Sequence, residues 1–181
     1  MSQATSGKLF AVFHPLHVFL SAIASAGLYR LYAKGGLVQT LLVGIVSAVA
    51  VGTLSDSLIP YLGELLFSTA DKHVHAHAHI GIIDWWWAVA PAAIAGSLLG
   101  FVRPKTTTPH AGHVLLSTAA SLFHMAMALE SGAGLLAVIG LPVFLFLAVW
   151  VPCCTSDIVL PLLLVPRDRW PACAHFHSHS E

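Results

Sequence analysis

Long apolar stretches constrain this chain more than any other feature of its sequence. A helix needs about 20 mostly apolar residues to cross a bilayer. Five stretches of the 181-residue chain reach that length: about 10–32, 37–55, 83–102, 111–130 and 134–153. Only 9% of the residues are charged and the mean hydropathy is +0.82, unlike an ordinary water-soluble domain. We expect an all-α integral membrane protein with about five transmembrane helices, in one membrane domain over 1–181.

Two further apolar segments are too short to cross a membrane. They cover about 57–67 and 158–166, and each follows a Ser-Asp pair and contains a proline. Irregular backbone at membrane depth is tolerated where it is buried in protein or lines a water-filled cavity. We therefore predict short re-entrant or interfacial segments after each Ser-Asp.

The distribution of basic residues predicts the orientation. Cytoplasmic loops carry an excess of Lys and Arg, and an outside amino terminus divides these residues six to two in favour of the inner side. The inner group is Arg30, Lys34, Arg103, Lys105, Arg167 and Arg169, and the outer group is Lys8 and Lys72. The carboxyl terminus is then inside, the three tryptophans at 85–87 are membrane anchors at the outer surface, and a prokaryotic inner (cytoplasmic) membrane is the expected location.

An internal repeat relates the two halves of the chain. Residues 14–25 read HPLHVFLSAIAS and residues 110–121 read HAGHVLLSTAAS, which are identical at seven of twelve positions. TLSDSLIP at 53–60 and CTSDIVLP at 154–161 then share a serine, the aspartate and the proline. The first span also has the outline of a cleavable signal peptide, but its two histidines interrupt the apolar run and belong to the repeat, so we favour a retained span.

The repeat divides the chain into unit one (14–79), a linking helix (80–109) and unit two (110–179). Each unit contains two predicted spans, so the single span between them turns the second unit upside down. Inverted repeats recur in secondary transporters, where the halves enclose a site at their interface. Gly96 and Gly100 in the linking helix form a G-x-x-x-G motif, which lets another helix pack closely.

Each unit begins with H-x-x-H and later supplies an aspartate. Histidines at i and i+3 share one face of a helix, and imidazole binds zinc, copper, nickel and iron. Two imidazoles and a carboxylate leave open positions on a bound ion. The predicted metal ligands are His14, His17 and Asp56 in unit one and His110, His113 and Asp157 in unit two, with His124 extending the second histidine stripe.

The predicted orientation separates these two ligand sets. The first falls at the outer ends of its spans and the second at the inner ends, so we expect two mirror-related clusters. Cys153 and Cys154 precede Asp157 and would add thiolates to the inner cluster. Ionisable groups at membrane depth are costly and by default mark a functional site.

Alternating histidines close each unit. His73, His75, His77 and His79 end unit one, and a second tract occupies 175–179. A flexible or extended segment of this kind binds metal weakly and exchanges it readily. We expect the tracts to capture and release ions on opposite sides of the membrane.

The other polar residues of the apolar segments are expected to serve structure. The serines that follow the histidines on the same helix faces are predicted to hydrogen-bond across helix interfaces; they are Ser21, Ser25, Ser117 and Ser121. Single carboxylates near the ends of segments are predicted to be solvated; they are Glu64, Asp84 and Glu130.

These features favour a membrane transporter or carrier for a divalent transition metal ion, with zinc, nickel, cobalt or copper as candidates. Two alternatives stay open: a membrane-embedded metal- or haem-dependent oxidoreductase or hydrolase, and an accessory subunit that delivers metal to a partner. Catalysis is less favoured because it needs one good site, whereas the repeat predicts two. The lipid bilayer is the expected partner, a homo-oligomer is compatible with so few helices, and the balanced charge gives no footprint for nucleic acid.

Overall fold

The computed structural model describes residues 3–68, 80–104, 107–128, 135, 139–140, 143–146, 149 and 159–165, and this part of the chain is helical without strands. Its elements are α1 (Gln3–Ala33), α2 (Leu37–Thr53), η1 (Leu54–Leu58), α3 (Ile59–Ser68), α4 (Gly81–Asp84), α5 (Trp86–Val102) and α6 (Thr107–Ala128). The all-α prediction is therefore confirmed for these residues. The predicted span 134–153 lies mostly outside them.

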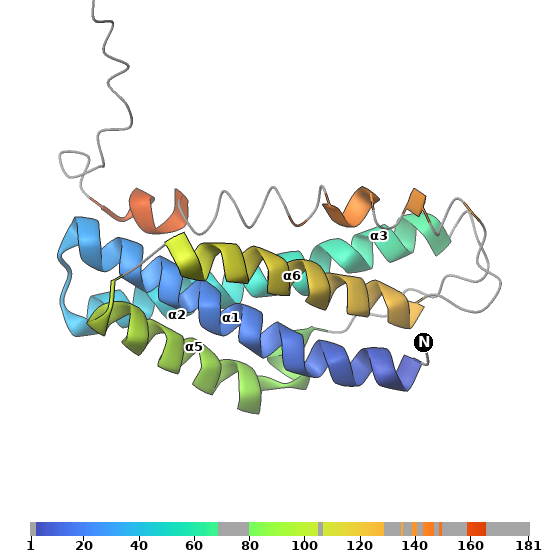
Figure 1. Ribbon diagram of the computed structural model, residues 1–181, viewed down its shortest axis with the longest axis horizontal. Coiled ribbons are helices and arrows are strands. Elements are labelled where there is room, and N and C mark those ends of the chain that lie inside the picture. The colour runs from blue at the N-terminus through green and yellow to red at the C-terminus, as the bar shows by residue number, and fades with distance from the viewer. Residues whose placement is uncertain are drawn as a thin grey trace, which may run out of the picture.

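Helix α1 lies at the centre of the arrangement and contacts α2, α5 and α6 (Figure 1). Helix α6 runs antiparallel to it. Gly7 near the beginning of α1 approaches Met127 near the end of α6, and Leu20 approaches Gly112 near the beginning of α6. The first helices of the two predicted repeat units therefore pack together in opposite directions.

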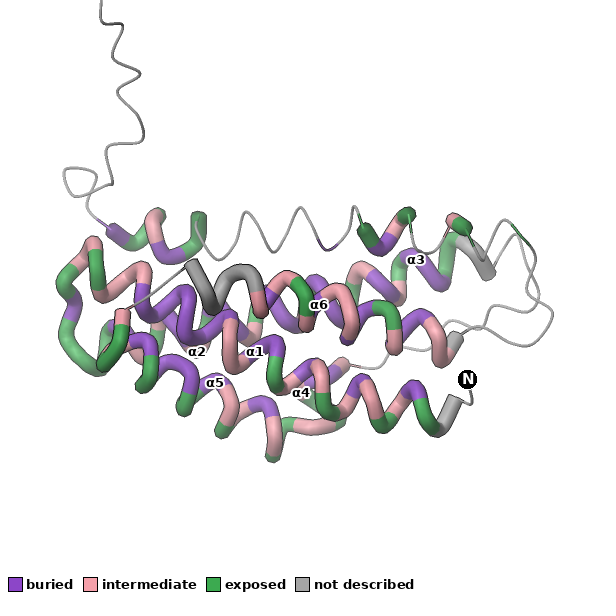
Figure 2. The backbone as a smooth tube through the Cα atoms, in the orientation of Figure 1, coloured by how far each residue is buried: buried purple, intermediate pink, exposed green. Residues whose placement is uncertain are grey.

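Polar side chains are buried in this bundle, and large apolar side chains cover much of its surface. Buried residues lie along the inward side of the long helices and exposed residues along the outer side (Figure 2). The buried polar residues include Ser21, Ser25, Thr40, Ser47 and Ser97, together with four histidines and two carboxylates. The exposed apolar residues include Val38, Leu42 and Val46 along α2 and Ile94, Leu98 and Val102 along α5. A water-soluble protein has the opposite distribution.

Two of the helices are long and apolar enough to cross a membrane: Thr5–Ala33 and Leu37–Leu66, while Trp86–Val102 is a shorter apolar helix. Together with the exposed apolar surface, they support association with a membrane. The arrangement in five spans is finer than this finding and stays a prediction.

The predicted break after Asp56 is absent. The second predicted span, 37–55, and the predicted short segment, 57–67, form one continuous helix that passes from α2 through the π-helical turn η1 into α3. Segment 57–67 is therefore not a separate re-entrant or interfacial piece. The proline at position 60 does not end the helix because other groups satisfy the carbonyls that it leaves without a donor, as the site shows below.

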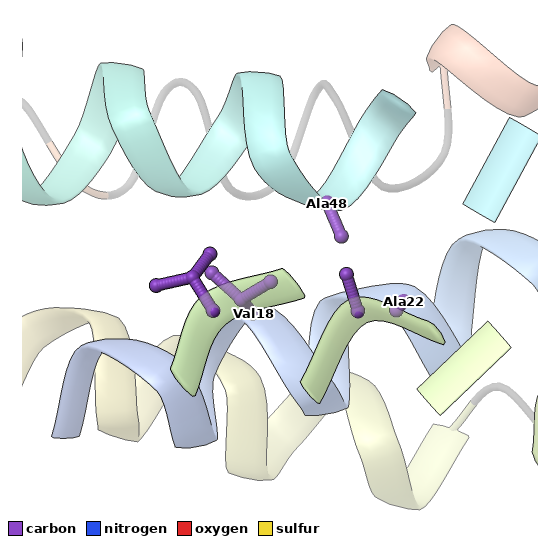
Figure 3. Close-up of a cluster of buried hydrophobic side chains, with 5 residues drawn as sticks. Val18, Ala22 and Ala48 are labelled. Carbon is purple, nitrogen blue, oxygen red and sulfur yellow. The ribbon is translucent and has the colours of Figure 1, made fainter. Parts of the chain in front are cut away.

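Small residues hold α1, α2 and α5 close together. Val18 and Ala22 of α1 face Ala48 of α2, and Val89 and Ala93 of α5 complete this apolar cluster (Figure 3). The G-x-x-x-G motif of α5 packs against α1, as expected from its sequence. A Cβ added to Gly96 would lie 2.3 Å from the carbonyl oxygen of Phe19, and one added to Gly100 would lie 2.6 Å from that of Ile23.

We expect Gly96→Ala to destabilise the protein by about 1–3 kcal/mol, because the new methyl group forces α5 away from the α1 backbone. Thermal unfolding in detergent measures the loss. Gly36→Ala is the matched control, since a Cβ at Gly36 meets nothing within 4 Å. Equal stability of the two variants would contradict the close contact between α1 and α5.

Candidate metal centre

The carboxylate of Asp56 is the centre of a buried polar cluster. His14 Nδ1 lies 2.9 Å and His17 Nδ1 lies 2.5 Å from its Oδ2 atom. Its Oδ1 atom accepts hydrogen bonds from the hydroxyl groups of Ser55 at 2.9 Å and Ser117 at 2.8 Å. A carboxylate has about four lone-pair sites, so these four contacts account for its capacity when both imidazoles donate through Nδ1–H.

The cluster is shielded from solvent. The side chains of His14, His17 and Asp56 have 1%, 0% and 0% of their surface exposed. None of the described Lys or Arg residues is buried, so no such side chain neutralises the carboxylate inside the described bundle. With two neutral imidazoles the group carries one negative charge, which suits a cation.

The π-helical turn η1 presents Asp56 to α1 and α6. Pro60 has no N–H group, and that group would reach the carbonyl of Asp56 in an α-helix or the carbonyl of Ser55 in a π-helix. Both carbonyls accept hydrogen bonds from α6 instead. The Ser121 hydroxyl donates to Ser55 O at 3.0 Å, and His124 Nδ1 donates to Asp56 O at 2.9 Å.

His113 joins the same cluster, which corrects the predicted mirror arrangement. Its ring centroid lies 4.4 Å from that of His17, and both side chains are fully buried. His17 and His113 are therefore not at opposite ends of their spans. The prediction was wrong because the helices extend beyond the apolar stretches: α1 begins at Gln3, so His17 lies near its middle.

His124 connects the cluster to a second buried carboxylate. Its Nε2 atom lies 3.5 Å from Oε1 of Glu64, and the two side chains are each 1% exposed. Glu64 is therefore not the solvated group that its position near a segment end predicted, because α3 continues α2 and keeps this side chain against α6. Asp84 is exposed, as expected.

Aromatic side chains enclose one side of the cluster. The Phe10 ring stacks on His14 at a centroid distance of 5.3 Å and meets His124 edge-on at 5.2 Å. Trp85 packs edge-on against Phe10 at 5.4 Å, so this tryptophan supports the site. Trp86 and Trp87 are each 64% exposed, which is compatible with a membrane anchor.

Several predicted ligands cannot be placed. The side chain of His110 lies outside the described residues, although its backbone belongs to α6. The remaining predicted ligands also lie outside the described residues: His73, His75, His77, His79, Cys153, Cys154 and Asp157. The predicted second cluster around Asp157 is therefore untested. The predicted role of Ser117 and Ser121 in bonds between helices is confirmed.

The donor set of the cluster fits a transition metal. One ligand atom each from His14, His17 and Asp56 lies within 4.8 Å of the others, and all three residues are buried. Two imidazoles and a carboxylate are borderline-to-hard ligands that suit zinc and its neighbours in the first transition series. Comparisons with models of protein families, with curated proteins and with solved structures found no match, so the functional proposal rests on these side chains.

We expect Ser117→Ala to destabilise the protein by about 0.5–2 kcal/mol, because it removes a hydroxyl donor from the buried Asp56 carboxylate. Thr118→Ala is the matched control, since the Thr118 hydroxyl donates only to Val114 O in its own helix among the contacts described. Thermal unfolding of the detergent-solubilised variants makes the comparison. A larger effect at Thr118 than at Ser117 would contradict the importance of the bond between α6 and Asp56.

Proposed function

We propose that this chain is a membrane transporter or carrier for a divalent transition metal ion, with zinc, nickel, cobalt or copper as the cargo. The observation that carries the proposal is the buried group of His14 and His17 near the middle of α1 and Asp56 on the second long apolar helix. Such groups are costly away from water and mark ion pathways. With both imidazoles neutral, the single negative charge of Asp56 would supply the attraction that a divalent cation needs after it loses its hydration water.

The origin of the cluster favours transport over catalysis. Unit one supplies α1 and η1, and unit two supplies Ser117 and His113 from α6, so the cluster lies between the predicted halves. Binding sites of transporters with inverted repeats lie at such an interface. His17 and His113 occupy equivalent repeat positions on antiparallel helices, as two units related by a two-fold axis in the membrane plane would require.

The proposal also covers the location of the chain, its orientation and its histidine tracts. We propose that the chain lies in a prokaryotic inner membrane with its amino terminus outside. The histidines at 73–79 would then offer exchangeable sites near the outer surface, and those at 175–179 near the inner surface. The proposed partner is the lipid bilayer, and a homo-oligomer with a second copy of the chain is compatible with the proposal.

We expect the double variant His14→Ala/His17→Ala to lose metal flux in proteoliposomes and to bind zinc at least about 10–100-fold more weakly than the wild-type chain. Flux of zinc, cobalt and nickel is followed with an ion-sensitive dye inside the vesicles. Metal analysis of the purified protein measures retention of the ion.

Ser97→Ala is the control variant, because it removes a buried hydroxyl from α5 without touching the cluster. Unchanged flux in the double variant would exclude the cluster as the transport site. Strong visible absorption of the purified protein by haem or oxo-bridged iron would instead favour the oxidoreductase alternative.

A further inference from the structure

The long helix formed by α2, η1 and α3 lacks internal hydrogen-bond donors at η1. Pro60 has no N–H group, so the carbonyls of Ser55 and Asp56 lack the donor that any other residue at position 60 would supply to one of them. A π-helical turn and a proline are two recognised causes of sharp bends in a helix. Here the turn ends at Leu58, two residues before the proline. The backbone by itself therefore offers little resistance to bending at this point.

Helix α6 supplies the donors that this backbone lacks. The Ser121 hydroxyl donates to Ser55 O at 3.0 Å, and His124 Nδ1 donates to Asp56 O at 2.9 Å. These bonds join two separate helices, whereas the backbone bonds of an ordinary α-helix lie within it. The present course of the long helix at η1 thus depends on the position of α6.

The two parts of the long helix pack against different neighbours. Helix α2 packs against α1 and α5, whereas α3 packs against α6 (Figure 1). A Cβ added to Gly63 of α3 would lie 3.0 Å from Cε of Met125, and His124 Nε2 lies 3.5 Å from Oε1 of Glu64. The turn η1 is therefore the boundary between a part held by α1 and α5 and a part held by α6.

We propose that η1 is a hinge between α2 and α3, which Ser121 and His124 of α6 hold in the observed arrangement. Asp56 lies within η1, so bending at the hinge changes the direction of its carboxylate relative to His14 and His17. A displacement of α6 is thereby transmitted to the buried polar cluster through hydrogen bonds to the backbone. The inference goes beyond the proposed function, because it concerns the backbone and holds whichever ligand the cluster binds.

The distance between two spin labels across η1 tests the hinge in the full-length chain. Leu42 of α2 and Leu66 of α3 are both exposed, and the labels are attached through Leu42→Cys and Leu66→Cys after the three native cysteines are replaced by serine. On a straight helix the two positions lie about 36 Å apart, and bending shortens this distance. We expect one narrow distance distribution for the labelled parent chain in detergent, and a broader distribution with a shorter component for Ser121→Ala.

Restoring the missing N–H group distinguishes a hinge from general loosening of the bundle. Pro60→Ala provides an internal donor for one of the two carbonyls, so we expect Pro60→Ala/Ser121→Ala to return to the narrow distribution. Thr118→Ala is the control on the same helix, because its hydroxyl donates to Val114 O, and it should match the labelled parent chain.

Two results would overturn the hinge. One is a distribution for Ser121→Ala equal to that of the parent chain, and the other is a broad distribution that Pro60→Ala does not narrow. If Ser121→Ala does not fold, His124→Phe removes the other donor to η1, and the same comparison decides. Metal flux does not enter this measurement, so failure of the hinge leaves the carrier proposal standing, and failure of the flux experiment leaves the hinge standing.

Discussion

The hydrogen bonding of the Asp56 carboxylate is the constraint on which the helix arrangement depends. Moving a carboxylate out of water costs several kcal/mol even after the surroundings relax. Hydrogen bonds to charged groups return about 1.5–3 kcal/mol each, and three of its four donors lie on other helices: His14 and His17 of α1 and Ser117 of α6. Satisfying one charge therefore fixes α1 and α6 against the continuous helix that carries Asp56.

The backbone carbonyls one turn before Pro60 also need hydrogen-bond donors. Pro60 cannot donate to the preceding turn, and a carbonyl left without a donor in an apolar environment is costly. Ser121 and His124 of α6 supply the missing bonds at Ser55 and Asp56. The π-helical turn, a type of turn that is frequent at functional sites, thus makes η1 a polar surface, which the serines and His124 of α6 cover.

The sequence predicted the chemistry of this site better than its location. The H-x-x-H spacing and the repeated Ser-Asp identified His14, His17 and Asp56, and the repeat identified the serines of α6. Residue spacing could not show that His17 and His113 meet, because apolar stretches mark the length in contact with lipid and α1 extends beyond its stretch to Gln3. The prediction for Glu64 was wrong because segment 57–67 was expected to be separate from the span before it, and the donors on α6 explain why the helix continues past Pro60. Gly81 carried no signal in the sequence, since its close packing against the His14 ring depends on the position of α4.

The way in which Asp56 is shared suggests how ion binding would act on the fold of a carrier. Any movement that separates α6 from α1 must break the Ser117 bond to Asp56 or the imidazole bonds from α1, and each loss exposes part of a buried charge. A divalent cation bound beside Asp56 would place positive charge near the carboxylate and would lower the cost of losing a neutral donor. A ligand shifts a conformational equilibrium only by its difference in affinity for the two states. Under the proposed function, the difference would arise because the ion and the Ser117 hydroxyl both stabilise the same carboxylate, and a bound ion would favour the state in which α6 has moved away.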